Sequence, residues 1–142
     1  MKFSVTIAII FIALFMSCTI ETTYNNRQKD KQAANSVVEK YYKYMEASQP
    51  KHAMELMSEK NAISIQNLSE IFATTNQELG RLEKFTLDSA KTNVVKGKKN
   101  QGRYTLFYTV LRKKYKTNDM FILTLEDSVI KILDYKAKVS FR

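Results

Sequence analysis

Tyrosine side chains are the most abundant groups in this chain that could transfer a proton, because the hydroxyl both donates and accepts hydrogen bonds. The chain has eight of them among 142 residues. Four fall on faces that we expect to point inward and are candidate pocket-lining residues: Tyr41, Tyr104, Tyr108 and Tyr135. Acid–base catalysis by tyrosine needs an acidic partner within reach. The carboxylates within the expected strands, Asp88 and Asp134, more easily face solvent, so we expect no catalytic residues and no enzymatic activity.

Metal and cysteine chemistry have little support in the composition. His52 is the one histidine and Cys18 the one cysteine in the chain. A zinc site needs several His or Cys ligands close together. We therefore expect His52 to lie on the surface, and we expect no metal and no cofactor. With a single cysteine, the domain is expected to be held together by its core alone, without an internal disulfide.

Three helices are predicted between residues 32 and 79. Apolar residues at helical spacing predict a first helix over residues 32–48, with these residues on one face: Ala34, Val37, Val38, Tyr41, Met45 and Ser48. Pro50 suits the first turn of a second helix over residues 51–58. A third helix is expected over residues 64–79. Gly80 follows it as a residue able to take the left-handed conformation that often ends helices.

A four-stranded antiparallel sheet is predicted after Gly80, where the apolar period changes from 3.6 to 2. Strands are expected over residues 82–95, 103–115, 120–125 and 129–139, with turns at residues 96–102, 116–119 and 126–128. The second strand is apolar on both faces, with Tyr104, Leu106, Tyr108 and Val110 on one of them, which places it centrally in the sheet. The predicted fold class is therefore α+β, with N-terminal helices packed on a curved four-stranded meander.

This order of elements resembles the nuclear transport factor 2-like (cystatin-like) fold, and in particular small lipoproteins of unknown function with that fold. The resemblance is carried by Leu79-Gly80, by Gly102-Arg103-Tyr104 and by the segment from Asp127 to Tyr135, and it spans residues 33–139. It implies a cone formed by the curved sheet and the helices. Enzymes of this fold class, such as ketosteroid isomerases, use a tyrosine donor with an acidic partner inside the cone, so the same tyrosines keep a ligand-binding or catalytic cone open as an alternative.

The N-terminus has the organisation of a secretory signal. Lys2 precedes an apolar stretch over residues 3–16, and the small residue Ser17 comes directly before Cys18. A membrane-spanning helix is the alternative, but it needs about 20 apolar residues. Phe15-Met16-Ser17-Cys18 is similar to a lipobox of Bacteroidetes-type bacteria, the motif at which lipoproteins are acylated on cysteine and cleaved before it. The resemblance implies a signal peptide over residues 1–17 and lipidation of Cys18, whereas an ordinary signal cut further on is the other reading.

The expected domain organisation follows from this motif. Residues 18–31 are polar except for Ile20 and are predicted to form a lipidated, flexible tether. Residues 32–142 are predicted to form the α+β domain. The protein is then expected in the cell envelope, held by the acyl chains of Cys18 to a membrane that faces the periplasm or the outside.

Basic residues give the chain a net charge of +9, or +8 after loss of Lys2. Such a charge attracts anionic polymers and headgroups, and outside the cytoplasm these are lipids and wall polymers rather than nucleic acid. If the first hairpin turns near Lys99, one cluster gathers at one end of the sheet as candidate contacts with an anionic surface: Arg81, Lys84, Arg112, Lys114 and Lys116. A second cluster, Lys96, Lys98, Lys99 and Arg103, gathers at the other end. Solvated lysines that protect strand edges are the alternative.

Three functions are compatible with these features. The favoured one is a non-enzymatic binding or interaction module on a membrane-anchored envelope lipoprotein, with an envelope protein or anionic polymer as partner. The second is a small-molecule-binding or catalytic cone. The third is an immunity or inhibitor lipoprotein that docks on a partner protein.

Overall fold

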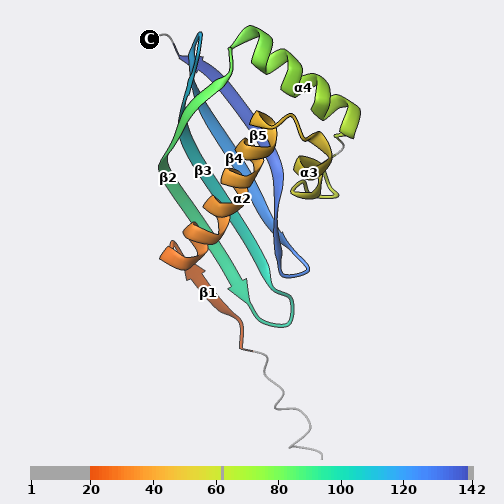
Figure 1. Cartoon of the computed structure of the whole chain (residues 1–142). Coiled ribbons are helices and arrows are strands. Elements are labelled where there is room, and N and C mark those ends of the chain that lie inside the picture. The colour runs from red at the N-terminus through yellow and green to blue at the C-terminus, as the bar shows by residue number, and fades with distance from the viewer. Residues whose placement is uncertain (1–19, 62, 141–142) are drawn as a thin grey trace, which may run out of the picture.

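The fold is known from a computed structural model that describes residues 20–61 and 63–140. Three helices lie together near one face of a single antiparallel sheet, and α2 crosses that face (Figure 1). The helices are α2 (Gln28–Glu46), α3 (Pro50–Glu55) and α4 (Ile65–Glu78). The strands are β1 (Thr22–Asn25), β2 (Leu82–Lys96), β3 (Gln101–Arg112), β4 (Lys116–Glu126) and β5 (Val129–Ser140). The α+β class and the predicted order, helices before the main meander, are confirmed.

The sheet has five strands in the order β1-β2-β3-β4-β5, so the prediction of four strands is wrong. The additional strand is β1, which pairs with the far end of β2 through Thr22 opposite Lys96 and Asn25 opposite Asn93. It lies within the segment predicted to be a flexible tether. Because its residues are polar and exposed at the edge of the sheet, no alternation of apolar residues marked it as a strand. The folded part therefore begins about ten residues before the predicted boundary at residue 32.

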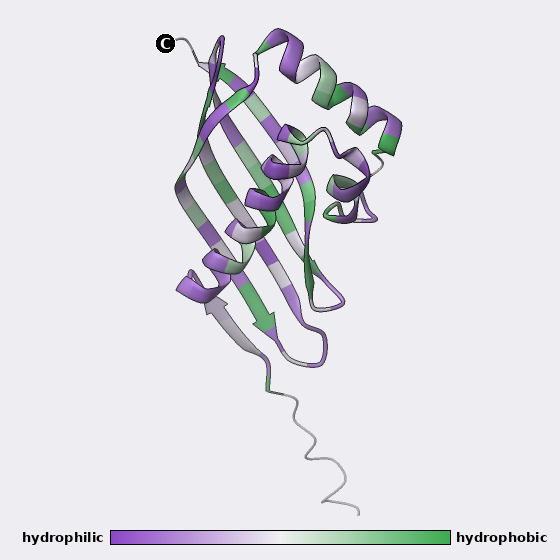
Figure 2. Ribbon diagram, in the orientation of Figure 1, coloured by the Kyte–Doolittle hydropathy of each residue, from purple (hydrophilic) through white to green (hydrophobic). Residues whose placement is uncertain are grey.

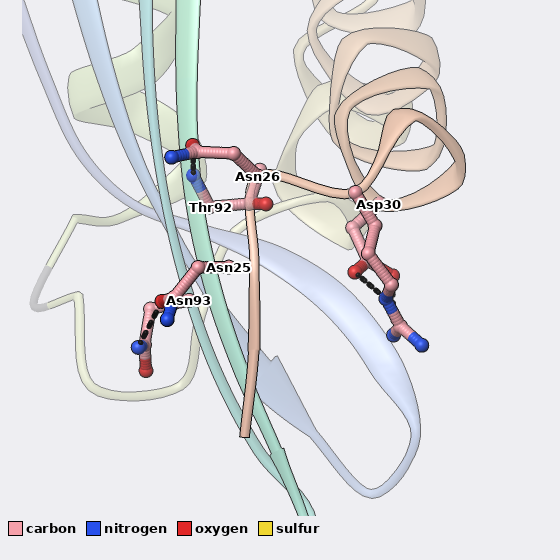
Figure 3. A network of polar contacts seen from close by, with 6 residues as sticks. Asn25, Asn26, Asp30, Thr92 and Asn93 are labelled. Atoms are coloured by element: carbon pink, nitrogen blue, oxygen red, sulfur yellow. Dashed lines mark hydrogen bonds and ion pairs between the residues drawn. The ribbon is translucent and has the colours of Figure 1, made fainter. Parts of the chain in front are cut away.

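The junction between β1 and α2 is held by a network of polar contacts (Figure 3). Asn26 adopts a positive φ of 52°, and its Oδ1 accepts a hydrogen bond from the Thr92 amide of β2 at 3.0 Å. The Asn93 side chain donates to Asn25 Oδ1 at 2.8 Å. Just beyond, the Arg27 guanidinium lies over the Tyr24 ring at 3.6 Å and pairs with Asp30 at 2.6 Å. Asparagine tolerates the left-handed conformation better than most residues, so this junction is a defined corner.

The helices follow their predicted positions with shifted ends. The buried residues of α2 are Ala34, Val38, Tyr41, Tyr42 and Met45. Ser64 caps α4 by accepting a hydrogen bond from the Asn67 amide. Gly80 follows α4 with φ of 85°, as predicted, and a Cβ there would lie 2.9 Å from both Lys113 Cβ and the Lys114 amide nitrogen. Glycine is thus required at this position for two reasons, the backbone conformation and the close approach of the β3–β4 turn.

The core lies between α2, the start of α4 and the inward face of β3, β4 and β5. Buried and more exposed residues alternate along β3 and β4, and hydrophobic and hydrophilic residues are interspersed along the strands (Figure 2). β3 occupies the centre of the sheet, as predicted. The segment after α3 is attached to β5, where the Ser58 amide donates to the Ile132 carbonyl at 2.8 Å and the Ile132 amide donates to the Leu56 carbonyl at 2.7 Å. α3 is thereby fixed beside the last strand.

Two turns differ in how well they were predicted. The β4–β5 turn lies at Asp127 and Ser128, as expected. The turn between β3 and β4 lies at residues 113–115 rather than 116–119, so residues 116–119 belong to β4. The expected pairing across the first hairpin is also displaced, because Arg112 pairs with Leu82 and not with Thr86. Register shifts in β2 near Glu83 and Asp88 account for part of this difference.

The β4–β5 turn leads to a stability prediction. Asp127 and Ser128 both have positive φ, at 44° and 68°, as the central residues of a type I′ turn do. Glycine at the second position adopts this conformation without steric cost. We expect Ser128→Gly to raise the free energy of unfolding by about 0.5–1 kcal/mol, measured by urea denaturation.

The control for this prediction is the same substitution inside a helix. Ser69→Gly, in the middle of α4, is expected to lower the free energy of unfolding by about 0.5 kcal/mol. Equal effects of the two substitutions would contradict the assignment of strain to the turn.

Candidate functional site

A buried carboxylate, Asp119, occupies the centre of the polar interior. It lies on the inward face of β4 and is 1% exposed. Its Oδ2 atom accepts hydrogen bonds from the Tyr42 hydroxyl of α2 at 2.9 Å and from the Tyr135 hydroxyl of β5 at 2.8 Å. Its Oδ1 atom has no hydrogen-bond partner among the described residues. One carboxylate oxygen therefore joins a helix to two neighbouring strands, while the other remains unused as an acceptor.

The position of Asp119 follows from the alternation of β4. Thr117, Asp119, Phe121 and Leu123 are buried, whereas the residues between them are more exposed. Asp119 lies opposite Tyr108 of β3 and Ala137 of β5. Sequence reasoning missed this residue because residues 116–119 were assigned to a turn. The signal that was available is the spacing of two that connects Thr117 and Asp119 to the apolar residues after them.

A buried arginine lies in the same region. Arg112, the last residue of β3, is 0% exposed, and its Nη1 and Nη2 atoms face the Met45 sulfur at 3.9 and 3.8 Å. The positive charge of Arg112 lowers the pKa of Tyr41 and of Tyr135, whereas the negative charge of Asp119 raises the pKa of both. The interior thus contains two opposite charges near the same tyrosines. The prediction that Arg112 contacts an anionic surface is wrong, because the alternation of β3 carries it inward after Tyr108 and Val110.

The predicted pocket-lining tyrosines all belong to the interior. Tyr41, Tyr108 and Tyr135 surround Phe121, with ring centroids 5.5, 5.9 and 4.6 Å from it. The Tyr108 hydroxyl also donates to Asn35 Oδ1 at 2.5 Å. Tyr104 lies further along β3, where its hydroxyl would be 2.7 Å from a Cβ placed on Gly102. Three of the four are therefore brought together, and Tyr42, which was not predicted, joins them through its contacts with Tyr41 and Phe121.

Burial keeps these hydroxyls protonated. Desolvation raises the pKa of Tyr42 far above its ordinary value, and the negative charge of Asp119 raises it further. The same two causes, in the same order, raise the pKa of Tyr41 and of Tyr135. For Tyr108, desolvation is again the main cause. At neutral pH the protonated hydroxyls of Tyr42 and Tyr135 donate to Asp119, and that of Tyr108 donates to Asn35.

The hollows described for this domain lie outside the cluster around Asp119. A groove of about 720 Å³ opens at the end of the sheet that carries the β2–β3 and β4–β5 turns. Its walls carry both charge signs, with Glu59, Lys60, Lys99, Asp127 and Lys131 among them. Ser58 donates to Glu126 at 2.5 Å in the same region, and the Lys131 ammonium donates to the Glu55 carbonyl. Tyr104 lines a smaller hollow of about 190 Å³ near the start of α2.

The remaining predicted contacts with an anionic surface gather at the opposite end of the sheet. Arg81, Lys84 and Lys114 are exposed and Lys116 is half-buried, all near the β3–β4 turn. The Lys114 ammonium donates to the Gln77 carbonyl of α4 at 2.5 Å, so part of its hydrogen bonding serves the fold. Lys96, Lys98 and Lys99 are exposed at the other end, on the β2–β3 turn.

His52, a possible metal site and a possible membrane-spanning helix are the remaining features considered from the sequence. His52 is exposed and stacks on Tyr44 at 5.4 Å. Within residues 20–61 and 63–140, no three His, Cys, Asp or Glu side chains come together as a metal site would require. Over the same residues, no helix has the length and apolar character needed to span a bilayer. Cys18 and the predicted signal peptide lie outside the described residues.

Comparison of the chain with models of known protein families and with curated proteins finds no match to either. The evidence for function therefore comes from the residues and their arrangement.

The buried tyrosines predict loss of stability at alkaline pH. Their pKa values are raised in the folded state, so above pH 10 the unfolded chain loses protons that the folded chain keeps. The unfolded state is then favoured as the pH rises, by about 1.4 kcal/mol per pH unit for each such tyrosine. We expect the free energy of unfolding, measured in urea, to be insensitive to these groups below pH 10 and to fall steeply between pH 10 and 11.5.

The variant Tyr42→Phe tests the assignment of this pH effect. It is expected to cost about 1–2 kcal/mol at pH 7, because Asp119 loses one donor, and to make the alkaline slope shallower by about 1.4 kcal/mol per pH unit. Tyr115→Phe, at an exposed position, is the matched control and should leave the slope unchanged. An unaltered slope in Tyr42→Phe would contradict the role of the buried hydroxyl.

Proposed function

We propose that the protein is a lipid-anchored protein of the cell envelope and that its domain is a non-enzymatic binding module. The observation that carries the proposal is the position of Cys18. An apolar stretch that follows Lys2 and the small residue Ser17 precede it, and β1 begins four residues after it. This is the arrangement of a signal that ends at an acylated cysteine. Two or more acyl chains give stable anchoring without a membrane-spanning helix.

The filled interior supports binding at the outer surface of the domain. Asp119 and Arg112 are almost completely buried, and aromatic rings from α2, β4 and β5, two of which carry the hydroxyls bonded to Asp119, pack against one another. The open groove and the basic turns instead lie at the ends of the sheet, where a partner has access. The binding surface is therefore assigned to these ends.

Mass spectrometry of the mature N-terminus tests the anchoring. The full chain is produced in a bacterial host that processes lipoproteins and is isolated from membranes. We expect a chain that begins at Cys18 and carries the added mass of acyl chains. Cys18→Ala should abolish the acylation and the membrane association, whereas Ser17→Ala, which keeps a small residue before the cysteine, should be processed normally. An unmodified wild-type chain cut at another position would overturn the proposal.

A second candidate function is a small-molecule site inside the cone, favoured by Asp119 Oδ1. This buried acceptor has no hydrogen-bond partner among the described residues, and four tyrosine rings lie nearby. An apolar molecule with one hydrogen-bond donor has the matching chemistry, because it would satisfy Oδ1 and pack on the rings. Access to this position requires movement of the helices that cover the sheet.

Indole is a suitable probe for this candidate, since it is apolar and donates one N–H. If the interior binds such molecules, saturation-transfer NMR detects indole binding to the wild type. Asp119→Asn should weaken the binding by roughly tenfold, because its amide group replaces the free acceptor with a donor. Asp134→Asn, at a partly exposed position of β5, is the control and should bind normally. Equal binding to both variants, or none to the wild type, counts against an interior site.

A further inference from the structure

The end of the sheet at which β1 begins carries several exposed lysines. Thr22 pairs with Lys96, so the chain that comes from Cys18 enters beside the β2–β3 turn. A Cβ on Gly97 would lie 2.6 Å from Glu21 Cγ, which shows how closely residue 21 packs on this turn. The four residues from Cys18 to Thr22 can span at most about 14 Å. An anchor at Cys18 would therefore hold this end of the domain close to the bilayer.

The junction between β1 and α2 fixes the orientation of the sheet relative to the residues that precede β1. The contacts of Asn25 and Asn26 with β2 attach the chain to the sheet before α2 begins (Figure 3). The Asn26 amide also donates to the Thr92 carbonyl at 2.9 Å. The direction of the long strands is thus set within about eight residues of Cys18.

Basic and apolar side chains gather where the chain enters. Lys96, Lys98 and Lys99, here called the anchor-end lysines, are all exposed. Ile20, two residues before the start of β1, is 84% exposed. The exposed residue Lys29 lines the same hollow as Lys96, at the start of α2. Among the acidic residues of this end, Glu59, Glu126 and Asp127 line the groove on the side of the β4–β5 turn. Two others lie on the side of the lysines, where Glu21 packs on the turn at Gly97 and Asp30 pairs with Arg27.

We propose that the anchor-end lysines dock the domain on the anionic lipid headgroups of the bilayer that holds Cys18. This inference rests on the proposed lipid anchor and assigns that anchor a specific orientation of the domain. The charge distribution tilts the molecule, with the β1–β2–β3 side against the membrane and the acidic β4–β5 turn away from it. Ile20 then lies at the interface between headgroups and acyl chains.

The cations at the opposite end do not share this role in the docked orientation. β2 spans 15 residues between the two ends, or about 45 Å of extended chain. Charges are screened over about 8 Å at physiological ionic strength. Arg81, Lys84 and Lys114 therefore project away from the membrane and remain accessible to other anionic partners.

Tryptophan fluorescence on a tethered domain tests the orientation. The chain contains no tryptophan, so single variants report one position each. A chain that begins at Cys18 contains every described element, and its single thiol can be coupled to maleimide lipid in vesicles of 70% phosphatidylcholine and 30% phosphatidylglycerol. We expect brominated lipids to quench Asn100→Trp, on the β2–β3 turn, and to leave Tyr115→Trp, on the opposite turn, unquenched.

Charge variants identify the groups that dock. A lysine near an anionic membrane contributes about fivefold to binding, so changing all three anchor-end lysines to glutamine should lower the docked-to-free ratio on the order of one hundredfold. The matched control removes the same charge at the other end through Arg81→Gln, Lys84→Gln and Lys113→Gln, and should leave quenching of Asn100→Trp unchanged. Raising the salt to 1 M, or using phosphatidylcholine alone, should also abolish the quenching.

The outcomes separate docking from anchoring. Maleimide coupling supplies the anchor whether or not the cell acylates Cys18, so the mass of the native N-terminus tests only the proposed function. Equal quenching of both tryptophans, or loss of quenching in the opposite-end control, would overturn the docked orientation. Quenching that persists after removal of the anchor-end lysines would do the same.

Discussion

The hydrogen bonds to Asp119 are the interaction on which the rest of the structure depends. They join α2, β4 and β5 at one carboxylate oxygen in the interior. A buried carboxylate is costly unless its hydrogen bonds are satisfied, so the helix must present Tyr42 and the last strand must present Tyr135 at the same point. A slip of β4 by one residue would turn Asp119 to the solvent and bring Met120 inward. The hydrogen bonds to Asp119 therefore favour the observed register of β4 more strongly than burial of its apolar residues would alone.

The sequence was sufficient to predict the elements whose residues are patterned by burial. The helices α2 and α4 and the left-handed conformation of Gly80 after α4 were predicted from local patterns that the structure retains. β1 was not predictable in this way, because an exposed edge strand of polar residues has no apolar face. The β3–β4 turn was misplaced because residues 113–119 are almost all polar or charged, and turn propensity does not distinguish a short turn from the first residues of a strand.

The interior site was predicted in part. Tyr41, Tyr108 and Tyr135 were placed inward by periodicity, whereas Tyr42 was missed because a helix on one flat face would bury only one of two adjacent tyrosines. α2 instead lies in a curved sheet, where Phe85 of β2 stacks on Tyr42 at 4.6 Å while Tyr41 contacts Phe72 of α4. Arg112 was placed at the surface because charged residues are expected there, and Asp119 was missed because its segment was assigned to a turn. Only the alternation of their own strands shows that they point inward.

The interior contains hydrogen-bonded polar groups and aromatic rings, whereas the ends of the sheet carry exposed charges, and this division affects how the domain can act. The hydrogen bonds of Asp119 with Tyr42 and Tyr135 hold α2, β4 and β5 together. A partner that bound to these groups would have to disrupt the packing of the interior. The turns at the ends of the sheet are exposed, and lysines on them such as Lys96, Lys98 and Lys99 are exposed as well, so a partner can contact them without disrupting the interior. A lipid anchor alone limits the distance of a domain from the bilayer but leaves its rotation free. The corner at Asn26 lies eight residues after Cys18, so under the proposed anchoring it would reduce that freedom. The first strand, which has no apolar pattern in the sequence, would then connect the proposed anchor to the orientation of the domain.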